Sequence, residues 1–425
     1  MNKRIIRKMV SMLTAGALLC ACGCAKDTPQ DAAQPQTDAG NADGVNIAAF
    51  FSASGASADY GVIDFRACQF AVDWINDKGG IASLGGAKLN LITGDLMSDA
   101  TQAKAVAERV LSNNKISAVV GSSTSSTTIP MLPVLEKARV PMVTSNYSPD
   151  IVGQGYSYIF MPCAKGTQHA QMQADFMKWM GAEKGVSVSK AAIVFEDSEV
   201  GRSTLNSAAP IIEGAGAEIV YNQSFPPGLS DASSIITAIK NSGAEVVFVN
   251  AQTADLKQLL STMKSMRYSP IIFGSAGGIL LHQFAEDMGD ECLGIVATAA
   301  CAADSKHNME NEEMVAYFNA YREEFGVQYI DEHVAQISNL IFTVAAGIEK
   351  AASTDGTEIR DAIASLDAEF VIPGGPYAFD ETGWNTNSVP ALVQWQKTED
   401  GSDYECRMIY PQELAHYEYV PLSGT

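Results

Sequence analysis

The chain has 425 residues, of which 47% are hydrophobic and 18% charged. This composition is too apolar for a disordered protein, and the length is sufficient for two domain cores. The formal net charge of −21 makes a surface that repels nucleic acid and anionic lipid. We therefore expect a bilobed globular protein that does not bind nucleic acid and does not use a basic patch to reach a membrane.

The N-terminal segment is typical of an export signal. Residues 1–21 begin with four basic residues and continue with a short apolar stretch and small residues. Residues 19–22, LCAC, resemble the lipobox of bacterial lipoproteins. That resemblance implies that Cys22 is diacylated on sulfur and becomes the mature N-terminus. Cys24 matches less well because Ala21 occupies the place of the usual leucine, and an ordinary secretory signal is the alternative.

The following segment predicts a tether. Residues 25–44 contain no branched aliphatic or aromatic residue, so they cannot build a core. A coil of this length reaches about 25 Å. We therefore expect residues 22–44 to be a lipidated, disordered tether that holds a folded protein close to the membrane, outside the cytoplasm.

The cysteines beyond the tether favour neither a disulfide scaffold nor a zinc site, because their number is odd and no two have CxxC spacing. They are Cys68, Cys163, Cys292, Cys301 and Cys406. Cys163 and Cys301 each follow a strand-like run and could form a pair. We favour buried free thiols instead.

From residue 45 onward, short β-branched runs alternate with segments of helical spacing. The runs are almost continuously apolar, which suits parallel strands that are covered on both faces. The strand-like runs are residues 45–51, 88–94, 116–122, 140–145, 190–196, 217–223, 244–251, 270–275 and 294–300. A longer helical stretch and a β-rich piece from about residue 368 follow.

The segments between the strands have one apolar face each. Within 99–114 the apolar residues recur at helical spacing, with Asp99 as the predicted cap. Within 59–78 the predicted stripe is Val62, Phe65, Val72 and Ile75. Alternating strands and helices predict an α/β fold of doubly wound parallel sheets. The chain has no glycine-rich phosphate-binding motif, so we expect no nucleotide cofactor.

Two polar turns follow predicted strands and are the first candidates for a binding site. Residues 121–128 gather seven serine and threonine hydroxyls and unpaired N–H groups after a strand, an arrangement that suits a carboxylate. Residues 144–149 are a second polar strand end. A solvated turn without ligand is the alternative for the first.

Several motifs then carry a resemblance to a known family. The segments VNIAAFFSASGASADYG, FAVDWINDKGGI, AVVGSSTSSTT, VPMVTSNYS and GYSYIFMPC resemble, in order and spacing, those of the bacterial Leu/Ile/Val-binding proteins. These are type I periplasmic binding proteins that deliver ligands to ABC importers. The resemblance implies two doubly wound lobes joined by a three-strand hinge. We expect lobe 1 to comprise residues 45–165 plus 301–370, and lobe 2 residues 166–300 plus 371–425.

The resemblance also implies how the first lobe holds an amino acid. Ser125 matches the serine that holds the α-carboxylate, and Tyr60 matches an aromatic residue of the side-chain pocket. The backbone carbonyl of Asn146 and the hydroxyl and N–H of Ser148 match positions that hold the ammonium and carboxylate groups. The neighbours Ser126 and Tyr147 complete the candidate set of this lobe.

The second lobe departs from the family pattern. Val200 stands in the place of a tyrosine, Gln252 in the place of another aromatic residue, and Ala276, beside Gly277, in the place of the acid that pairs with the ammonium. A buried ammonium without a carboxylate is strongly unfavourable. The ligand is therefore either not an ordinary α-amino acid or is paired by a different acid.

Four acids are candidates for this pairing. Our hypothesis is that Glu196 or Glu199 pairs with a cationic group of the ligand; Asp197 lies on the same loop, and Asp255 is less favoured. Solvated loop charges are the alternative interpretation.

These observations predict an extracytoplasmic, lipid-anchored solute-binding protein. We expect it to capture a small carboxylate-bearing ligand, such as a branched-chain or other amino acid or an amide-like molecule, for an ABC permease of the branched-chain amino acid type. A sensory module that signals to a receptor partner is the alternative. The scattered histidines and the lack of an HExxH or GxSxG motif favour a monomeric binding protein with no cofactor and no metal over an enzyme.

Overall fold

The computed structural model describes residues 44–197, 199–275, 277–367 and 377–421. The predicted signal peptide (residues 1–21), residues 22–43 of the predicted tether with the predicted lipidation site Cys22, and the candidate Ala276 lie outside these residues. None of the helices in the described ranges combines the length and apolar character that a membrane span needs.

The first sheet has five parallel strands in the order β2-β1-β3-β4-β5. In its register, Ile47 of β1 lies opposite Leu91 on one side and Ala118 on the other. The strands are β1 (Val45–Phe51), β2 (Leu89–Asp95), β3 (Ala118–Gly121), β4 (Met142–Val143) and β5 (Ile159–Phe160).

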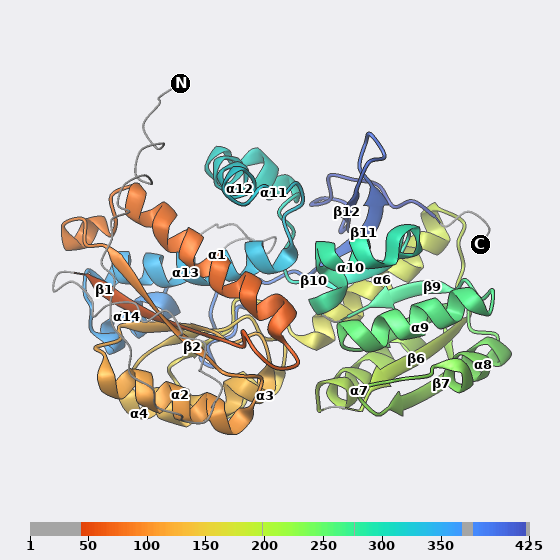
Figure 1. The fold of residues 1–425 in the computed structure, drawn as a ribbon, viewed down its shortest axis with the longest axis horizontal. Helices are drawn as coiled ribbons and strands as arrows, with labels where there is room; N and C mark the ends of the chain where they lie inside the picture. The colour runs from red at the N-terminus through yellow and green to blue at the C-terminus, as the bar shows by residue number, and fades with distance from the viewer. Residues whose placement is uncertain (1–43, 198, 276, 368–376, 422–425) are drawn as a thin grey trace, which may run out of the picture. The chain divides into compact units, whose positions relative to one another are not determined.

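Helices cover both faces of this sheet, as Figure 1 shows. Ile47, Ala49 and Phe51 point into one core, and Ala48 and Phe50 point into the other. The first core contains α1 (Ala58–Asp77), α12 (Glu312–Phe325), α13 (Glu332–Ala351) and α14 (Gly356–Ala364). The second contains α2 (Ala100–Asn113), α4 (Leu132–Ala138) and α5 (Pro149–Val152). Because alternate residues enter opposite cores, β1 is apolar at every position except Asn46.

The second sheet has seven strands in the order β12-β11-β10-β9-β8-β6-β7. Its pairs are parallel except at one edge, where β11 runs antiparallel to both β10 and β12, so the sheet is mixed. The strands are β6 (Lys190–Glu196), β7 (Glu218–Phe225), β8 (Val246–Asn250), β9 (Ile271–Gly274), β10 (Val296–Ala299), β11 (Ala391–Lys397) and β12 (Tyr404–Tyr410).

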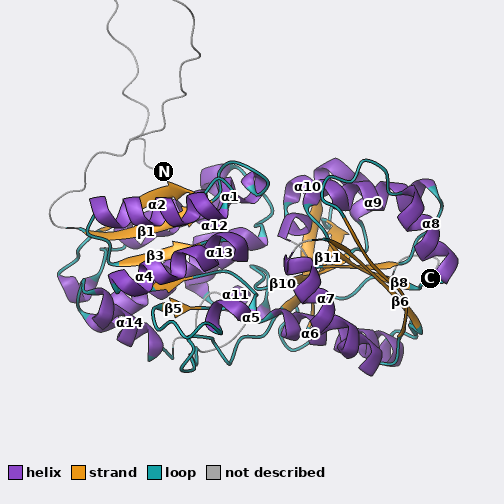
Figure 2. Cartoon of the chain, turned by 90° about the horizontal axis from the view of Figure 1, so that it is seen from below, coloured by secondary structure: helices purple, strands orange, loops and turns teal. Residues whose placement is uncertain are grey.

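This sheet is also covered on both faces, as Figure 2 shows. Helices α6 (Gly166–Glu183) and α7 (Glu199–Gly214) contribute to one core. Helices α8 (Ser233–Ser242), α9 (Thr253–Ser265) and α10 (His282–Met288) contribute to the other. The predicted α/β architecture of two wound sheets is therefore confirmed.

The chain passes from one sheet to the other three times: after β5, after β10 and before β11. The short helix α11 (Lys306–Glu310) follows the second crossing. Before the third crossing, Tyr377 lies in the core of the first sheet, Phe379 packs 5.2 Å from Phe160, and Trp384 pairs with Met161.

The sequence predicted some elements closely and others less well. Strands 45–51 and 190–196 have the observed bounds, and Asp99 caps α2 by accepting hydrogen bonds from two backbone N–H groups. The stripe on α1 is partly wrong, because Val62 is 55% exposed. Small residues such as Ala67 and Ala71 form the buried face instead, which allows α1 to pack closely against α13.

The five described cysteines are buried and form no disulfide. Burial raises the pKa of Cys163 to about 12 and the pKa of Cys301 well above its ordinary value. Both groups are therefore protonated thiols at neutral pH, in agreement with the interpretation that we favoured.

Candidate functional site

Each sheet has one point at which the strand order reverses, and ligands of doubly wound folds bind at such points. In the first sheet β1 lies between β2 and β3. The loops that leave β1 and β3 there are residues 52–57 and 122–124, and the second of these belongs to the predicted Ser/Thr turn.

Two glycines let the backbone close around this point. Gly121 has a φ of +114°, and a Cβ there would lie 2.2 Å from the carbonyl oxygen of Phe50. A Cβ at Gly61 would lie 1.9 Å from the carbonyl oxygen of Ser52. Only glycine permits these approaches, so the Ser/Thr turn and the start of α1 both pack against the end of β1.

The Ser/Thr turn is held by hydrogen bonds among its own hydroxyls and by the next strand end. The hydroxyl of Ser122 lies 2.6 Å from that of Thr127 and 2.9 Å from that of Thr128. The backbone carbonyl oxygen of Ser122 accepts from the side-chain amide of Asn146 at 2.6 Å and from the hydroxyl of Thr144 at 3.2 Å. The two polar turns predicted from the sequence are therefore fastened to each other.

The predicted carboxylate-binding serine lies inside this arrangement. Ser125 donates its hydroxyl hydrogen to Oδ1 of Asn146 at 3.0 Å. Ser126 is exposed. The hydroxyl of Ser148 accepts from the backbone N–H of Asp150 at 3.3 Å and caps α5. The structure thus brings Ser125 and Asn146 together, while the side chain of Ser148 caps a helix.

Tyr60 lies on the first turn of α1 and is buried. Its hydroxyl donates to Ser57 at 2.8 Å, and its ring lies 5.0 Å from that of His333. Burial raises the pKa of Tyr60 to about 12, and the carboxylates of Asp59, Asp64 and Glu196 raise it as well. Tyr60 is therefore neutral and close to several acids.

A buried ionic pair next to Tyr60 escaped the sequence analysis. Oδ1 of Asp64 lies 2.8 Å from Nδ1 of His333, and its other oxygen accepts from the hydroxyl of Ser123. Burial alone lowers the pKa of His333, but Asp64, with Glu332, outweighs this effect and raises it to about 9. His333 is therefore an imidazolium at neutral pH. The signal available in the sequence was the placement of Asp64 one helical turn after Tyr60.

Tyr147 is directed toward the crossing segments. Its hydroxyl donates to Oε1 of Glu332 at 3.3 Å and accepts from Gln336 at 3.3 Å, and its ring lies 4.6 Å from that of His169. Burial raises the pKa of Tyr147 well above its ordinary value and lowers the pKa of His169 to about 4. Oε1 of Glu332 also accepts from the N–H of Ala300 at 3.0 Å. This cluster ties a predicted ligand-binding turn to the second crossing.

In the second sheet the strand order reverses at β6, which lies between β7 and β8. Glu196 ends β6, is 8% exposed, and accepts from the backbone N–H of Gln252 at 3.2 Å. Thr253, the next residue, donates its hydroxyl to Asp59 at 3.0 Å. Because this hydrogen bond joins the first turn of α1 to the first turn of α9, the two switch points face each other.

The other acidic candidates differ in their surroundings. Both carboxylate oxygens of Asp255 accept from backbone N–H groups, those of Gly228 and Leu229, at 2.9 and 2.7 Å. Asp255 thus fixes a loop. Asp197 forms an ion pair with Arg202.

Three further candidates are described only in part. Glu199 and Val200 begin α7, and Gly277 begins a short 3-10 helix. Their side-chain surroundings lie outside what the structure describes.

Two cavities occur elsewhere in the described ranges. One, of about 100 Å³, lies among the crossing segments and the β10–β12 edge, and the other, of about 550 Å³, lies near the amino ends of β9 and β10. The predicted site residues line neither. No group of three potential metal ligands occurs within the described residues.

Residues 44–401 match the family described as periplasmic binding protein, and the chain belongs to this family. Its members are non-enzymatic substrate-binding proteins. The family resemblance inferred from the sequence is therefore confirmed.

Individual relatives are distant. A Leu/Ile/Val-binding protein homolog 7 of Brucella suis is 24% identical over 380 residues, which cover 87% of this chain and 92% of the relative. A leucine-, isoleucine-, valine-, threonine- and alanine-binding protein of Pseudomonas aeruginosa is 25% identical over 358 residues, 84% of this chain and 91% of the relative.

Solved structures agree in fold. The branched-chain amino acid transporter substrate-binding protein LivJ of Streptococcus pneumoniae, in complex with isoleucine, has a TM-score of 0.72 and 20% identity, covering 86% of this chain and 100% of its own. A solute-binding protein of an ABC transporter from Rhodopseudomonas palustris, in complex with 3,4-dihydroxy benzoic acid, has a TM-score of 0.73 and 18% identity, covering 90% and 99%.

Proposed function

We propose that this protein is an extracytoplasmic solute-binding lipoprotein that captures a small carboxylate-bearing ligand, either an amino acid or an amide-like molecule, and delivers it to an ABC permease of the branched-chain amino acid type. One observation carries the proposal. The hydroxyl-rich switch point beside Tyr60 faces the switch point that bears Glu196, and the Thr253–Asp59 hydrogen bond joins them.

The first switch point binds the carboxylate of the ligand. Isoleucine and 3,4-dihydroxy benzoic acid, the molecules bound in two similar structures, share a carboxyl group and little else. This supports a common carboxylate site beside variable contacts. In the proposed complex Ser125 exchanges its hydrogen bond to Asn146 for one to the ligand, and this costs little because one acceptor replaces another.

Glu196 pairs with the cationic group of the ligand. It is nearly buried, and the described residues offer it a single hydrogen bond, from the N–H of Gln252. A ligand ammonium would supply the opposite charge that a buried carboxylate favours. Glu196 would then replace the acid whose place in the family pattern is taken by Ala276.

Ligand capture proceeds by hinge closure. A ligand that contacts both switch points binds the closed arrangement more tightly than the open one and shifts the population toward it. We propose two lobes, with the first two boundaries near residues 165 and 300 as the sequence predicts. Because Tyr377 and Phe379 pack with one core of the first sheet and Trp384 with the other, we propose that lobe 1 continues past Trp384 rather than ending at residue 370. The rest of lobe 2 then begins with β11.

A ligand panel tests the proposal. Amino acids, amides and short carboxylates are added separately, and the thermal unfolding midpoint is measured; a ligand at 100 times its Kd should stabilise by about 2.7 kcal/mol. The ligand that binds should also decrease the radius of gyration in X-ray scattering. Binding without any such decrease would contradict hinge closure.

The lipid anchor needs its own test. Metabolic labelling with a radioactive fatty acid in a bacterial host should mark the full chain and the Cys24→Ala variant, but not the Cys22→Ala variant. Labelling that survives Cys22→Ala and is lost in Cys24→Ala would move the anchor to Cys24.

A further inference from the structure

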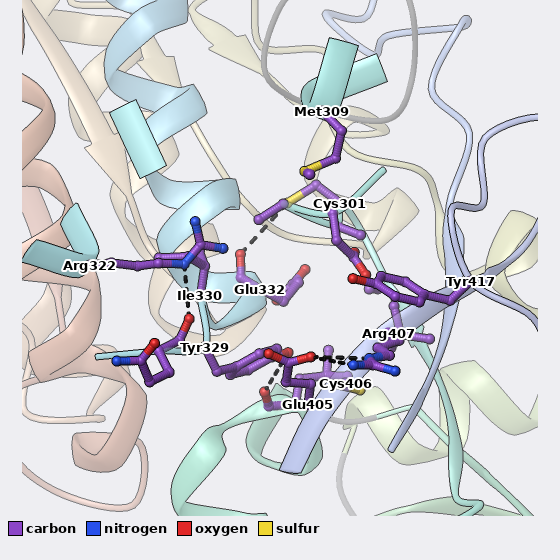
Figure 3. A pocket seen from close by; sticks show the side chains of 17 residues that line it. Cys301, Met309, Arg322, Tyr329, Ile330, Glu332, Glu405, Cys406, Arg407 and Tyr417 are labelled. Carbon is purple, nitrogen blue, oxygen red and sulfur yellow. Dashed lines mark hydrogen bonds and ion pairs between the residues drawn. The ribbon is translucent and has the colours of Figure 1, made fainter. Parts of the chain in front are cut away.

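The cavity of about 100 Å³ lies apart from the predicted binding residues, where α12 and the segment after it meet the edge strands of the second sheet. Figure 3 shows Arg322 and Tyr417 entering it from opposite sides. Asp304, Glu405 and Arg407 also line it. The cavity is thus built from segments that are far apart in the sequence.

Two of the charges in the cavity neutralise each other. Arg407 contacts the carboxylate of Glu405 through Nε at 3.1 Å and through Nη2 at 3.0 Å (Figure 3). The guanidinium of Arg407 also lies 4.4 Å from the centre of the Tyr417 ring. Arg407 and Glu405 therefore need no charged ligand as a partner.

Two opposite charges remain. Arg322 donates to the carbonyl of Gln328 at 2.9 Å and to the side-chain oxygen of Asn319 at 3.1 Å, both neutral acceptors. Asp304 accepts from the N–H of Met408 at 3.0 Å. Among the residues that the structure describes, neither side chain has an oppositely charged group within ion-pair distance.

The surroundings penalise both charged forms. Burial raises the pKa of Asp304 to about 6 and lowers the pKa of Arg322. A molecule carrying both a negative and a positive group would stabilise the two ions at once, whereas water would satisfy only their hydrogen bonds.

The volume limits the size of such a molecule. At about 30 Å³ for each water, the cavity holds about three waters or one molecule of about five non-hydrogen atoms. We propose that this cavity is a second ligand site, specific for a zwitterion of the size of glycine, with the ligand carboxylate on Arg322 and its ammonium on Asp304.

The second site is coupled to the lobe arrangement. Glu332 lines the cavity, and the same carboxylate holds Tyr147 of the first lobe and Ala300 of the second crossing. Arg322 belongs to a helix of the first core, whereas Met408 and Arg407 belong to β12 of the second sheet. A ligand here therefore favours the lobe arrangement that keeps these elements together.

Glycine binding to the purified protein, measured by equilibrium dialysis with radioactive glycine, tests the proposal. Arg322→Gln and Asp304→Asn should each weaken binding about tenfold or more, as expected for loss of a charge-assisted contact. Arg109→Gln, on the exposed face of α2, is the matched control and should bind as the unaltered protein does. Ala303→Leu, which fills the cavity without changing charge, should also weaken binding.

A crystal structure at saturating glycine provides the second measurement. Density for glycine between Arg322 and Asp304 would support the proposal, and water alone in the cavity would overturn it. Glycine binding that falls in Glu196→Gln but not in Arg322→Gln would place glycine at the switch points. That result would overturn the second site while supporting the proposed function.

Discussion

The two switch points are built differently. In the first sheet, hydroxyls, amides and the Asp64–His333 pair form a continuous network in which most polar groups already have partners. In the second sheet, Glu196 has one described contact, to the N–H of Gln252. The first point is therefore preorganised for a constant chemical group, and the second leaves a charge for the variable part of the ligand to satisfy.

The largest expected effect comes from a substitution at the switch point of the first sheet. Asp64→Asn leaves the imidazolium of His333 buried without its carboxylate, and we expect the free energy of unfolding to fall by about 3 kcal/mol. Urea denaturation measures this change. The matched control is Asp73→Asn, an exposed position on the same helix; equal losses in the two variants would show that the pair is unimportant.

The same pair predicts a pH dependence of stability. The pKa of His333 is about 9 in the folded protein and about 6.5 when unfolded. Because the folded pKa is the higher one, the stabilisation is complete below pH 6.5 and is lost as the pH rises through 9. The loss should be roughly 3 kcal/mol at most. Asp64→Asn should flatten this slope, and an unchanged slope would contradict the assignment.

A substitution at the switch point of the second sheet should change the affinity for the ligand more than the free energy of unfolding. For a ligand with an ammonium group, Glu196→Gln should raise Kd about 100-fold, which corresponds to about 2.7 kcal/mol. Isothermal titration calorimetry measures Kd. Glu218→Gln, on an exposed position of the same sheet, should leave Kd unchanged, and a similar Kd for all three proteins would exclude the pairing.

A smaller effect is expected at the hydroxyl-rich point. Ser125→Ala removes one of several donors to the ligand carboxylate, so Kd should rise about tenfold. Ser112→Ala, on the exposed face of α2, serves as the control in the same titration. If Ser125→Ala binds as tightly as this control, the carboxylate is held elsewhere.

The smallest effect concerns the contact between the two points. Thr253→Val removes the hydrogen bond to Asp59 and keeps the shape of the side chain. Since the contact is exposed, we expect Kd to rise only about threefold. Stopped-flow measurements should show this change in the dissociation rate, and an altered association rate alone would contradict a role in the closed form.

The sequence was informative about the sheets because parallel strands covered on both faces are apolar throughout. It was less informative about short strands, since the two residues of β5 carry no periodicity of their own. On α1, small residues form the buried face, and a search for large apolar side chains selected Val62 instead. Periodicity therefore predicted that α1 is a helix, but it did not predict which face of α1 packs against the core.

The residues of the candidate site were also predicted only in part. The Ser/Thr turn and Asn146 were found because a run of hydroxyls after a strand is conspicuous. Asp64 and His333 were not, because they lie 269 positions apart in the chain and only the fold brings them together. A pair of this kind has no local sequence pattern. The importance of Glu196 became specific only when its burial and its proximity to Tyr60 were known.

The antiparallel edge of the second sheet has a consequence for biogenesis. Strands β11 and β12 leave the ribosome well after β10, and β10 has no partner on that side until β11 arrives. A nascent chain that stops short of residue 391 therefore presents an open strand edge, which promotes association with other chains. Keeping the polypeptide unfolded until synthesis is complete would protect it from this hazard.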